Sequence, residues 1–226
     1  RMRHVGRTLT VAMTERLIER CRAEGTTISA ALAAGVSRSL AATLGASSPM
    51  KCLVSVNVRP DCRRDVRTLG NYVGGLCTEV APSQPFWEVA RSHRAEVVQQ
   101  MEQKQHLLLA VRPPFGYSLQ LSAGKKKHPH ADDDPGIGNM LAVSNRGAFQ
   151  LATGSHRVRA LHWVRQHQGD DDTDLLLLNA VSVDSLLCLT FCYKHPVVAE
   201  ATIVDIADAL LSELLVASGS GGTVTS

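Results

Sequence analysis

Residues 175–193 read LLLLNAVSVDSLLCLTFCY, two apolar runs separated by the polar pair Asp184 and Ser185. Each run is mostly apolar and has the length of a strand. A two-residue polar link between two such runs is the usual sequence pattern of a β-hairpin. We therefore predict a hairpin formed by residues 175–183 and 186–193.

Residues 51–59 contain a second strand signal of a different kind. Cys52, Val54, Val56 and Val58 alternate with Leu53, Ser55, Asn57 and Arg59. Because successive strand residues face opposite sides, this alternation predicts a strand with one buried face and one mostly polar face, ended by Pro60. Further strand signals occur at residues 8–11, 76–80, 140–144 and 158–164.

Four helices are predicted between and after these strands. They run from Thr14 to Gly25, from Thr26 or Thr27 to Gly45, from about Pro85 onward, and from about Thr202 onward. The second helix carries Ala30, Ala31, Ala33, Ala34 and Gly35, and such small residues suit close packing on a sheet. The predicted fold class is α/β, a two-layer mixed sheet with helices packed on it.

Composition excludes several classes of protein. The 24 basic and 21 acidic residues give a net charge of +3. A charge this small does not create the strong positive surface field that would indicate a nucleic-acid partner. No apolar run approaches the roughly 20 residues of a membrane-spanning helix, and the first residues have no secretory signal. The six cysteines lack a C-x-x-C pair, so we expect reduced thiols and a cytoplasmic protein.

Residues 122–139 have no periodicity and carry blocks of both charges, so they are predicted to form a mobile surface loop. Within it, His128, His130, Asp132 and Asp133 could converge on zinc, but a flexible loop beside three lysines argues against a metal site. Residues 218–226 are predicted to be a flexible tail. Residues 1–217 are then one globular unit.

Four short sequence patterns follow one another along the chain. They are Val56-Asn57-Val58-Arg59-Pro60, Leu69-Gly70-Asn71-Tyr72-Val73-Gly74, Ala142-Val143-Ser144-Asn145-Arg146-Gly147, and the hairpin at Asp184 with its closing helix. Together they resemble the carboxy-terminal lobe of the acyltransferase superfamily that joins condensation domains, alcohol acetyltransferases and plant BAHD enzymes. The resemblance implies one lobe of a chloramphenicol acetyltransferase-like fold.

The same resemblance implies an acyl-transfer reaction, for which this sequence lacks the catalytic histidine motif. In that superfamily a histidine of the motif His-His-x-x-x-Asp-Gly takes the proton of an alcohol or amine acceptor as it attacks an acyl thioester. None of the nine histidines here lies in such a motif. We therefore expect a missing amino-terminal lobe that carries it, an acyl-CoA or carrier-bound acyl thioester as co-substrate, a small-molecule alcohol or amine acceptor, and no cofactor or metal bound by this lobe.

The motif positions are the candidate substrate-binding residues, because the family's substrate tunnel runs between its two lobes. They are Asn57, Arg59, Gly70, Asn71, Ser144, Asn145 and Gly147. A structural alternative has Arg59 paired with a carboxylate and Asn57 holding a turn. Ser144–Gly147 also replaces the Asp-Phe-Gly-Trp-Gly of the plant branch, which favours the acetyltransferase or condensation side.

A second interpretation belongs to a different functional class. The chain could be a non-catalytic interaction module, or a pseudo-enzyme, that binds a partner through its former domain interface. The two hypotheses differ in what the reading frame encodes upstream of Arg1. A His-His-x-x-x-Asp-Gly motif there favours a fragment of an enzyme, and a start codon favours the module.

Overall fold

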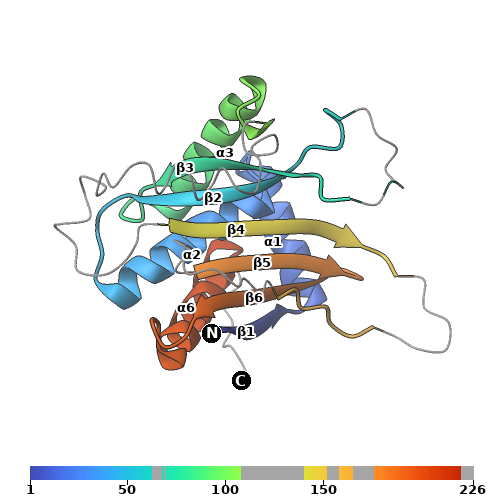
Figure 1. The fold of residues 1–226 in the computed structure, drawn as a ribbon. Helices are drawn as coiled ribbons and strands as arrows, with labels where there is room; N and C mark the ends of the chain where they lie inside the picture. The colour runs from blue at the N-terminus through green and yellow to red at the C-terminus, as the bar shows by residue number, and fades with distance from the viewer. Residues whose placement is uncertain (63–67, 69, 108–139, 152–157, 165–175, 220–226) are drawn as a thin grey trace.

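The computed structural model describes residues 1–62, 68, 70–107, 140–151, 158–164 and 176–219. Its strands are β1 (Met2–Leu9), β2 (Met50–Asn57), β3 (Val73–Val80), β4 (Met140–Phe149), β5 (Leu176–Val183) and β6 (Leu186–Lys194). Its helices are α1 (Val11–Ala23), α2 (Ile28–Leu44), α3 (Phe86–Glu102) and α6 (Glu200–Ala217). The strands form one sheet with helices α1, α2, α3 and α6 on one face (Figure 1), which confirms the two-layer α/β prediction.

The sheet is mixed, with the strand order β1-β6-β5-β4-β2-β3. β2, β4 and β5 are parallel neighbours, whereas β5 pairs antiparallel with β6. Asp184 and Ser185 have φ angles of 47° and 66°. Two successive positive φ angles match the right-handed twist of a hairpin, so the predicted hairpin is confirmed together with its turn.

The core lies between the helices and one face of the sheet. Alternate residues of β5 and β6, including Leu178, Leu189 and Phe191, are fully buried there against α2 and α6. A Cβ atom on Gly35 would lie 2.5 Å from Leu210 of α6. The small residues of α2 therefore permit the close helix packing that the sequence predicts.

The amino-terminal boundary differs from the prediction. The predicted strand exists, but β1 occupies Met2–Leu9 rather than residues 8–11, and the helix begins at Val11 rather than after Thr14. The cap is Thr10, whose Oγ1 accepts a hydrogen bond from Met13 N at 3.3 Å. Thr14 is buried instead, and its Oγ1 accepts from Leu187 N at 3.3 Å. Thr10 and Thr14 are both residues of the type that caps helices, and the structure uses Thr10 as the cap while Thr14 is buried.

Other predicted elements are confirmed with changed bounds. Thr27 caps α2, and Gly45 ends it with a φ of 69°. On the face of β2 predicted to be buried, Cys52, Val54 and Val58 are buried. Val56 is only half-buried, because its partner on β3 is Gly74, which has no side chain. No strand occurs at residues 158–164, whose side chains are exposed. The strand predicted there is therefore wrong.

Helix α3 follows Pro85, as predicted, and buries one polar residue beside its apolar ones. Phe86 and Val97 pack against the core while half-buried. The buried residues of the helix are Val89, Ala90 and His93. His93 is accommodated because its Nδ1 lies 3.0 Å from the hydroxyl of Thr78 on β3.

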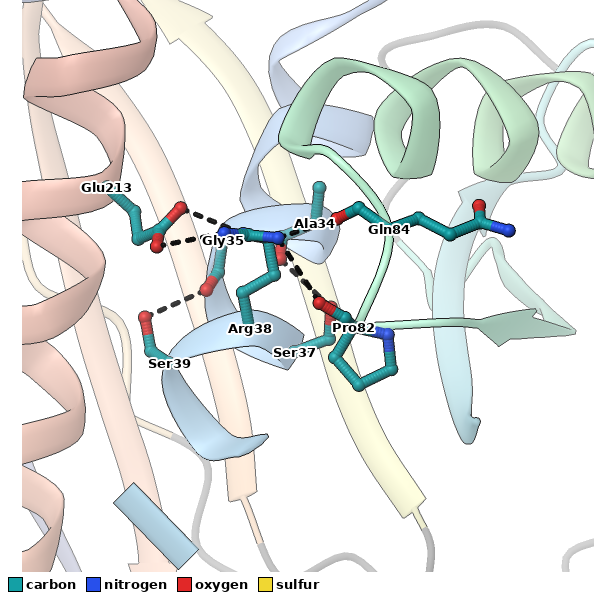
Figure 2. Close-up of polar contacts among 8 residues, drawn as sticks. All are labelled: Ala34, Gly35, Ser37, Arg38, Ser39, Pro82, Gln84 and Glu213. Carbon is teal, nitrogen blue, oxygen red and sulfur yellow. Dashed lines mark hydrogen bonds and ion pairs between the residues drawn. The ribbon is translucent and has the colours of Figure 1, made fainter. Parts of the chain in front are cut away.

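An arginine on α2 ties together three parts of the helical layer (Figure 2). Nε of Arg38 lies 2.9 Å from Glu213 of α6. Nη1 of the same side chain donates to the carbonyl oxygens of Pro82 and Gln84, at 3.2 and 2.6 Å. One guanidinium therefore holds the connection between β3 and α3 to both α2 and α6.

Replacing this arginine is expected to destabilise the fold by about 2 kcal/mol, because Arg38→Ala leaves two carbonyls and a half-buried carboxylate without their donor. Arg3→Ala is the matched control, since Arg3 pairs with Glu200 at an exposed site. Its cost is expected to stay below about 1 kcal/mol. Urea denaturation midpoints measure both, and equal losses would contradict the role of Arg38.

The other predictions about the chain have mixed outcomes. The segment 122–139, predicted to be a mobile loop, and most of the predicted tail 218–226 lie outside the described residues. All six cysteines are free thiols, four of them buried. No single described helix combines the length and apolar character needed to cross a membrane; only α1 and α2 taken together pass, and they meet at a bend of 101°.

Candidate functional site

The predicted site residues gather at one edge of the sheet. Because β2, β4 and β5 are parallel, their carboxyl ends lie on the same side, as the arrowheads of β4 and β5 show in Figure 1. β3 is antiparallel to β2 and begins there. In sheets of this kind, ligands commonly bind outside the carboxyl ends of the strands. We call this region the carboxyl edge.

Asn57 and Arg59 shape the turn that leaves β2. Oδ1 of Asn57 accepts a hydrogen bond from Arg59 N at 3.1 Å. The guanidinium of Arg59 stacks on Tyr72, 4.2 Å from the ring centroid, and donates to the carbonyl of Thr68 at 2.8 Å. Asn57 therefore holds a turn, as the structural alternative predicted. A substrate-binding role for either residue stays a prediction.

Gly70 and Asn71 precede β3 at the same edge. A Cβ atom on Gly70 would lie 2.8 Å from the ring of Tyr72, so glycine leaves room for the ring on which Arg59 stacks. Asn71 is exposed. The motif Gly70-Asn71-Tyr72 thus supports the stacked guanidinium of Arg59, which explains why the two sequence patterns occur together.

The motif Ser144–Gly147 forms an irregularity near the end of β4, where the pairing with β5 shifts between Asn145 and Ala148. Gly147 has a φ of 82°, which favours glycine. Oδ1 of Asn145 accepts from Gly147 N at 3.0 Å, and its Nδ2 donates to Ser29 of α2 at 3.0 Å. Asn145 therefore faces the helices, while its neighbours Ser144 and Arg146 face the other side of the sheet.

That other side carries three buried polar residues, of which the sequence analysis singled out only Ser144. Ser144 pairs in register with Asn179 of β5, and Asn179 pairs with Thr190 of β6. Thr190 is 1% exposed and Asn179 is 3% exposed. We call these three residues the polar row. A polar residue in the middle of an otherwise apolar strand, as in 175–183 and 186–193, is the signal that could have revealed them.

Residues 158–164 lie over the end of this row. Nδ1 of His162 is 3.0 Å from the hydroxyl of Thr190, and Leu161 N donates to Cys188 Sγ at 3.5 Å. The imidazole also covers Gly6 of β1, where a Cβ atom would lie 3.0 Å from Cε1. A polar contact and a backbone hydrogen bond thus anchor the segment to β6.

Arg146 and Trp163 join this segment to the end of β4. The guanidinium carbon of Arg146 lies 3.9 Å from the ring centroid of Trp163. Burial lowers the pKa of Arg146. Neither residue was among the sequence-based site candidates: Arg146 was quoted within its motif without a role, and Trp163 was placed in a strand.

A carboxylate and a histidine also pair near the carboxyl edge. Asp61, which follows the turn of Arg59, accepts a hydrogen bond from Nε2 of His106 at 3.0 Å, and this bond lowers the pKa of the carboxyl. His106 is 2% exposed, and its Nδ1 has no hydrogen-bond partner in the described part of the chain. The pair resembles an oriented base chemically, but the imidazole of His106 is buried and Asp61 alone is exposed, so the imidazole is not open to a substrate.

His93 is excluded as a base in a similar way. The hydroxyl of Thr78 donates to the carbonyl of Cys52 at 3.2 Å, so it accepts the Nδ1–H of His93. Burial lowers the pKa of His93 to about 4, which keeps the ring neutral. Within the described residues no group of three or more metal-ligating side chains occurs, and the candidate metal ligands of residues 128–133 lie outside them.

Comparison with known proteins gives a match in structure but none in sequence. No family model and no curated protein matches the chain. The trichothecene 15-O-acetyltransferase of Fusarium sporotrichioides superimposes with a TM-score of 0.71 at 17% identity, over 96% of this chain and 47% of that one. Polyketide synthase associated protein 5 from Mycobacterium tuberculosis gives 0.64 at 14% identity, over 98% and 54%.

The epimerization domain from the third module of tyrocidine synthetase B gives a TM-score of 0.63 at 16% identity, over 96% of this chain and 48% of that one. The chain therefore spans about half the length of these proteins. Such low identities establish the fold alone, and they confirm the resemblance inferred from the four motifs at that level. The chain has the fold of one lobe of a condensation-type acyltransferase.

Proposed function

We propose that this chain is the carboxy-terminal lobe of an acyltransferase that moves an acyl group from a CoA or carrier thioester to an alcohol or amine. The observation that carries the proposal is the convergence at the carboxyl edge. Asn57 and Arg59 after β2, and Asn145 to Gly147 near the end of β4, come from motifs more than 80 residues apart, yet they meet at one edge of the sheet. A site of this kind serves as one wall of a substrate path.

The catalytic base in this proposal belongs to an amino-terminal lobe with the motif His-His-x-x-x-Asp-Gly. His93 and His106 are buried and committed to Thr78 and Asp61. General base catalysis contributes about 10²–10⁴-fold to such a reaction. We therefore expect the 226-residue chain alone to show no turnover.

Release of free thiol from acetyl-CoA with a panel of alcohols and amines tests the proposal. The assay compares the 226-residue chain with the native polypeptide isolated from its source. Turnover is expected only for a polypeptide that includes the amino-terminal lobe. Turnover by the isolated chain that survives single replacement of every histidine would overturn the assigned mechanism.

Within an active polypeptide, Arg59→Ala is expected to lower the acyl-transfer rate more than stability, whereas Val54→Ala should do the reverse. Val54 is 8% exposed on the helix side, so its truncation leaves a cavity costing about 1–3 kcal/mol. Arg59 lies beyond the end of β2 at the carboxyl edge, where its guanidinium stacks on Tyr72. Equal unfolding of both variants would make Arg59 a structural residue only.

An interaction module remains the second candidate, because large apolar side chains are exposed in and beside residues 158–164. They are Phe149, Leu151, Val158, Leu161, Trp163 and Val164. A surface of this composition suits contact with another lobe or another protein. A native polypeptide without the histidine motif, bound stably to a partner, would favour the module. A cytosolic location stays a prediction under both hypotheses.

A further inference from the structure

Arg146 carries a positive charge that the described part of the chain does not neutralise. Arg146 is an exposed residue whose guanidinium stacks on Trp163 at 3.9 Å, and this partial burial lowers its pKa. Within the described residues no carboxylate lies at ion-pair distance from it. The five N–H donors of a guanidinium normally find oxygen partners when a site is partly removed from water.

Five other arginines of the described residues each form an ion pair with Asp or Glu: Arg3, Arg7, Arg20, Arg38 and Arg91. Arg159, like Arg146, forms none with a described carboxylate, but no aromatic ring stacks on it among the described residues. Stacking on indole recovers only part of the hydration that a guanidinium loses. An anion bound at Arg146 would recover the rest, so the unneutralised charge favours a ligand with anionic oxygens.

Both members of the stack are held in place before any ligand arrives. Asn145 and Gly147 fix the backbone on either side of Arg146, through the hydrogen bond from Gly147 N and the contact with Ser29. The segment that carries Trp163 is attached to β6 by the hydrogen bond from Leu161 N to Cys188 Sγ, besides the contact of His162 with Thr190. Pre-organised groups lose little conformational entropy on binding, which raises affinity.

We propose that Arg146 and Trp163 bind the phosphate end of the phosphopantetheine arm of the acyl donor. This inference rests on the proposed function, which requires a thioester donor. The guanidinium matches the geometry of phosphate oxygens. The indole of Trp163, 45% exposed, offers an apolar surface to the adjoining arm. CoA and carrier proteins share this phosphate chemistry, so both donors would use the site.

Tryptophan fluorescence tests the site directly. The chain has two tryptophans, so Trp87→Phe leaves Trp163 as the reporter. We expect CoA and 4′-phosphopantetheine to change its emission saturably, and pantetheine without phosphate to have little effect. Equal affinities for CoA and phosphopantetheine would indicate a carrier donor, and tighter binding of CoA would indicate that the nucleotide is also recognised. Calorimetry on the chain with both tryptophans provides an independent affinity.

Arg146→Gln is expected to weaken binding about tenfold or more, because it removes the charged donors and leaves the indole. Arg159→Gln is the matched control, since Arg159 is an exposed arginine of the segment 158–164 that carries Trp163. The site is overturned if neither phosphate ligand binds, if pantetheine binds equally well, or if Arg146→Gln retains full affinity. Because binding needs no turnover, loss of acyl transfer with binding retained would instead contradict the proposed function.

Discussion

Acidification from neutral pH to about pH 4.5 is expected to destabilise the fold, with buried His93 responsible for about 2.5 kcal/mol. Burial lowers the pKa of His93 from 6.5 to about 4. Between these values the unfolded chain binds a proton that the folded protein excludes, so stability falls as the pH falls. Above pH 6.5 His93 is neutral in both states and the effect vanishes. The magnitude follows because a tenfold difference in proton affinity between the two states is worth about 1.4 kcal/mol.

His93→Asn isolates this effect. Asparagine keeps an N–H donor for the hydroxyl of Thr78 but does not titrate, so the variant is expected to lose less stability on acidification than the parent. At neutral pH it should be the less stable of the two, because it is smaller than the ring it replaces. Urea denaturation at several pH values measures both curves. Parallel curves would show that His93 gains its proton while folded.

Gly74→Ala is expected to cost about 3 kcal/mol, at the upper end of overpacking effects. A Cβ atom at this position would overlap the backbone carbonyl oxygen of His106 and would lie 2.8 Å from Val58. A backbone carbonyl cannot rotate away as a side chain can. The turn after α3 would therefore have to move, and with it the hydrogen bond between His106 and Asp61.

Gly6→Ala is the control for this substitution in another strand. Its Cβ atom would meet the imidazole of His162 at 3.0 Å, and that exposed side chain can turn aside. We expect a loss below about 1 kcal/mol. Thermal or chemical denaturation compares the two variants. Similar small losses would show that β3 and the end of α3 do not approach as closely as described.

The helices and the hairpin were predictable because their signals are local. Thr27 and Gly45 bracket α2, and a two-residue polar link at Asp184 and Ser185 joins two apolar runs. Capping and turn formation involve residues a few positions apart, so the sequence contains the whole interaction. A local signal also placed the start of the first helix wrongly, because threonine at residue 10 or 14 can serve as a cap and only burial distinguishes Thr14 from Thr10.

The candidate site was predictable in part for a different reason. Asn57, Arg59, Asn145 and Gly147 were found through motifs, and the structure adds how they are held. The partners of Arg59 and Asn145 are Tyr72 and Ser29, which lie 13 and 116 residues away in the chain. No local pattern predicts such pairs, since they depend on which strands become neighbours.

The sequence by itself determined an α/β chain with alternating strands, capped helices, a closing hairpin and no histidine motif for catalysis. Only the tertiary structure decided that β2 and β4 are parallel neighbours, that His93 is buried, and that Arg146 stacks on Trp163 with no carboxylate of the described residues to neutralise it. The physical reason is the distance along the chain between the residues that interact. Capping, turns and alternation are fixed by residues a few positions apart, whereas burial and charge neutralisation depend on contacts between distant segments.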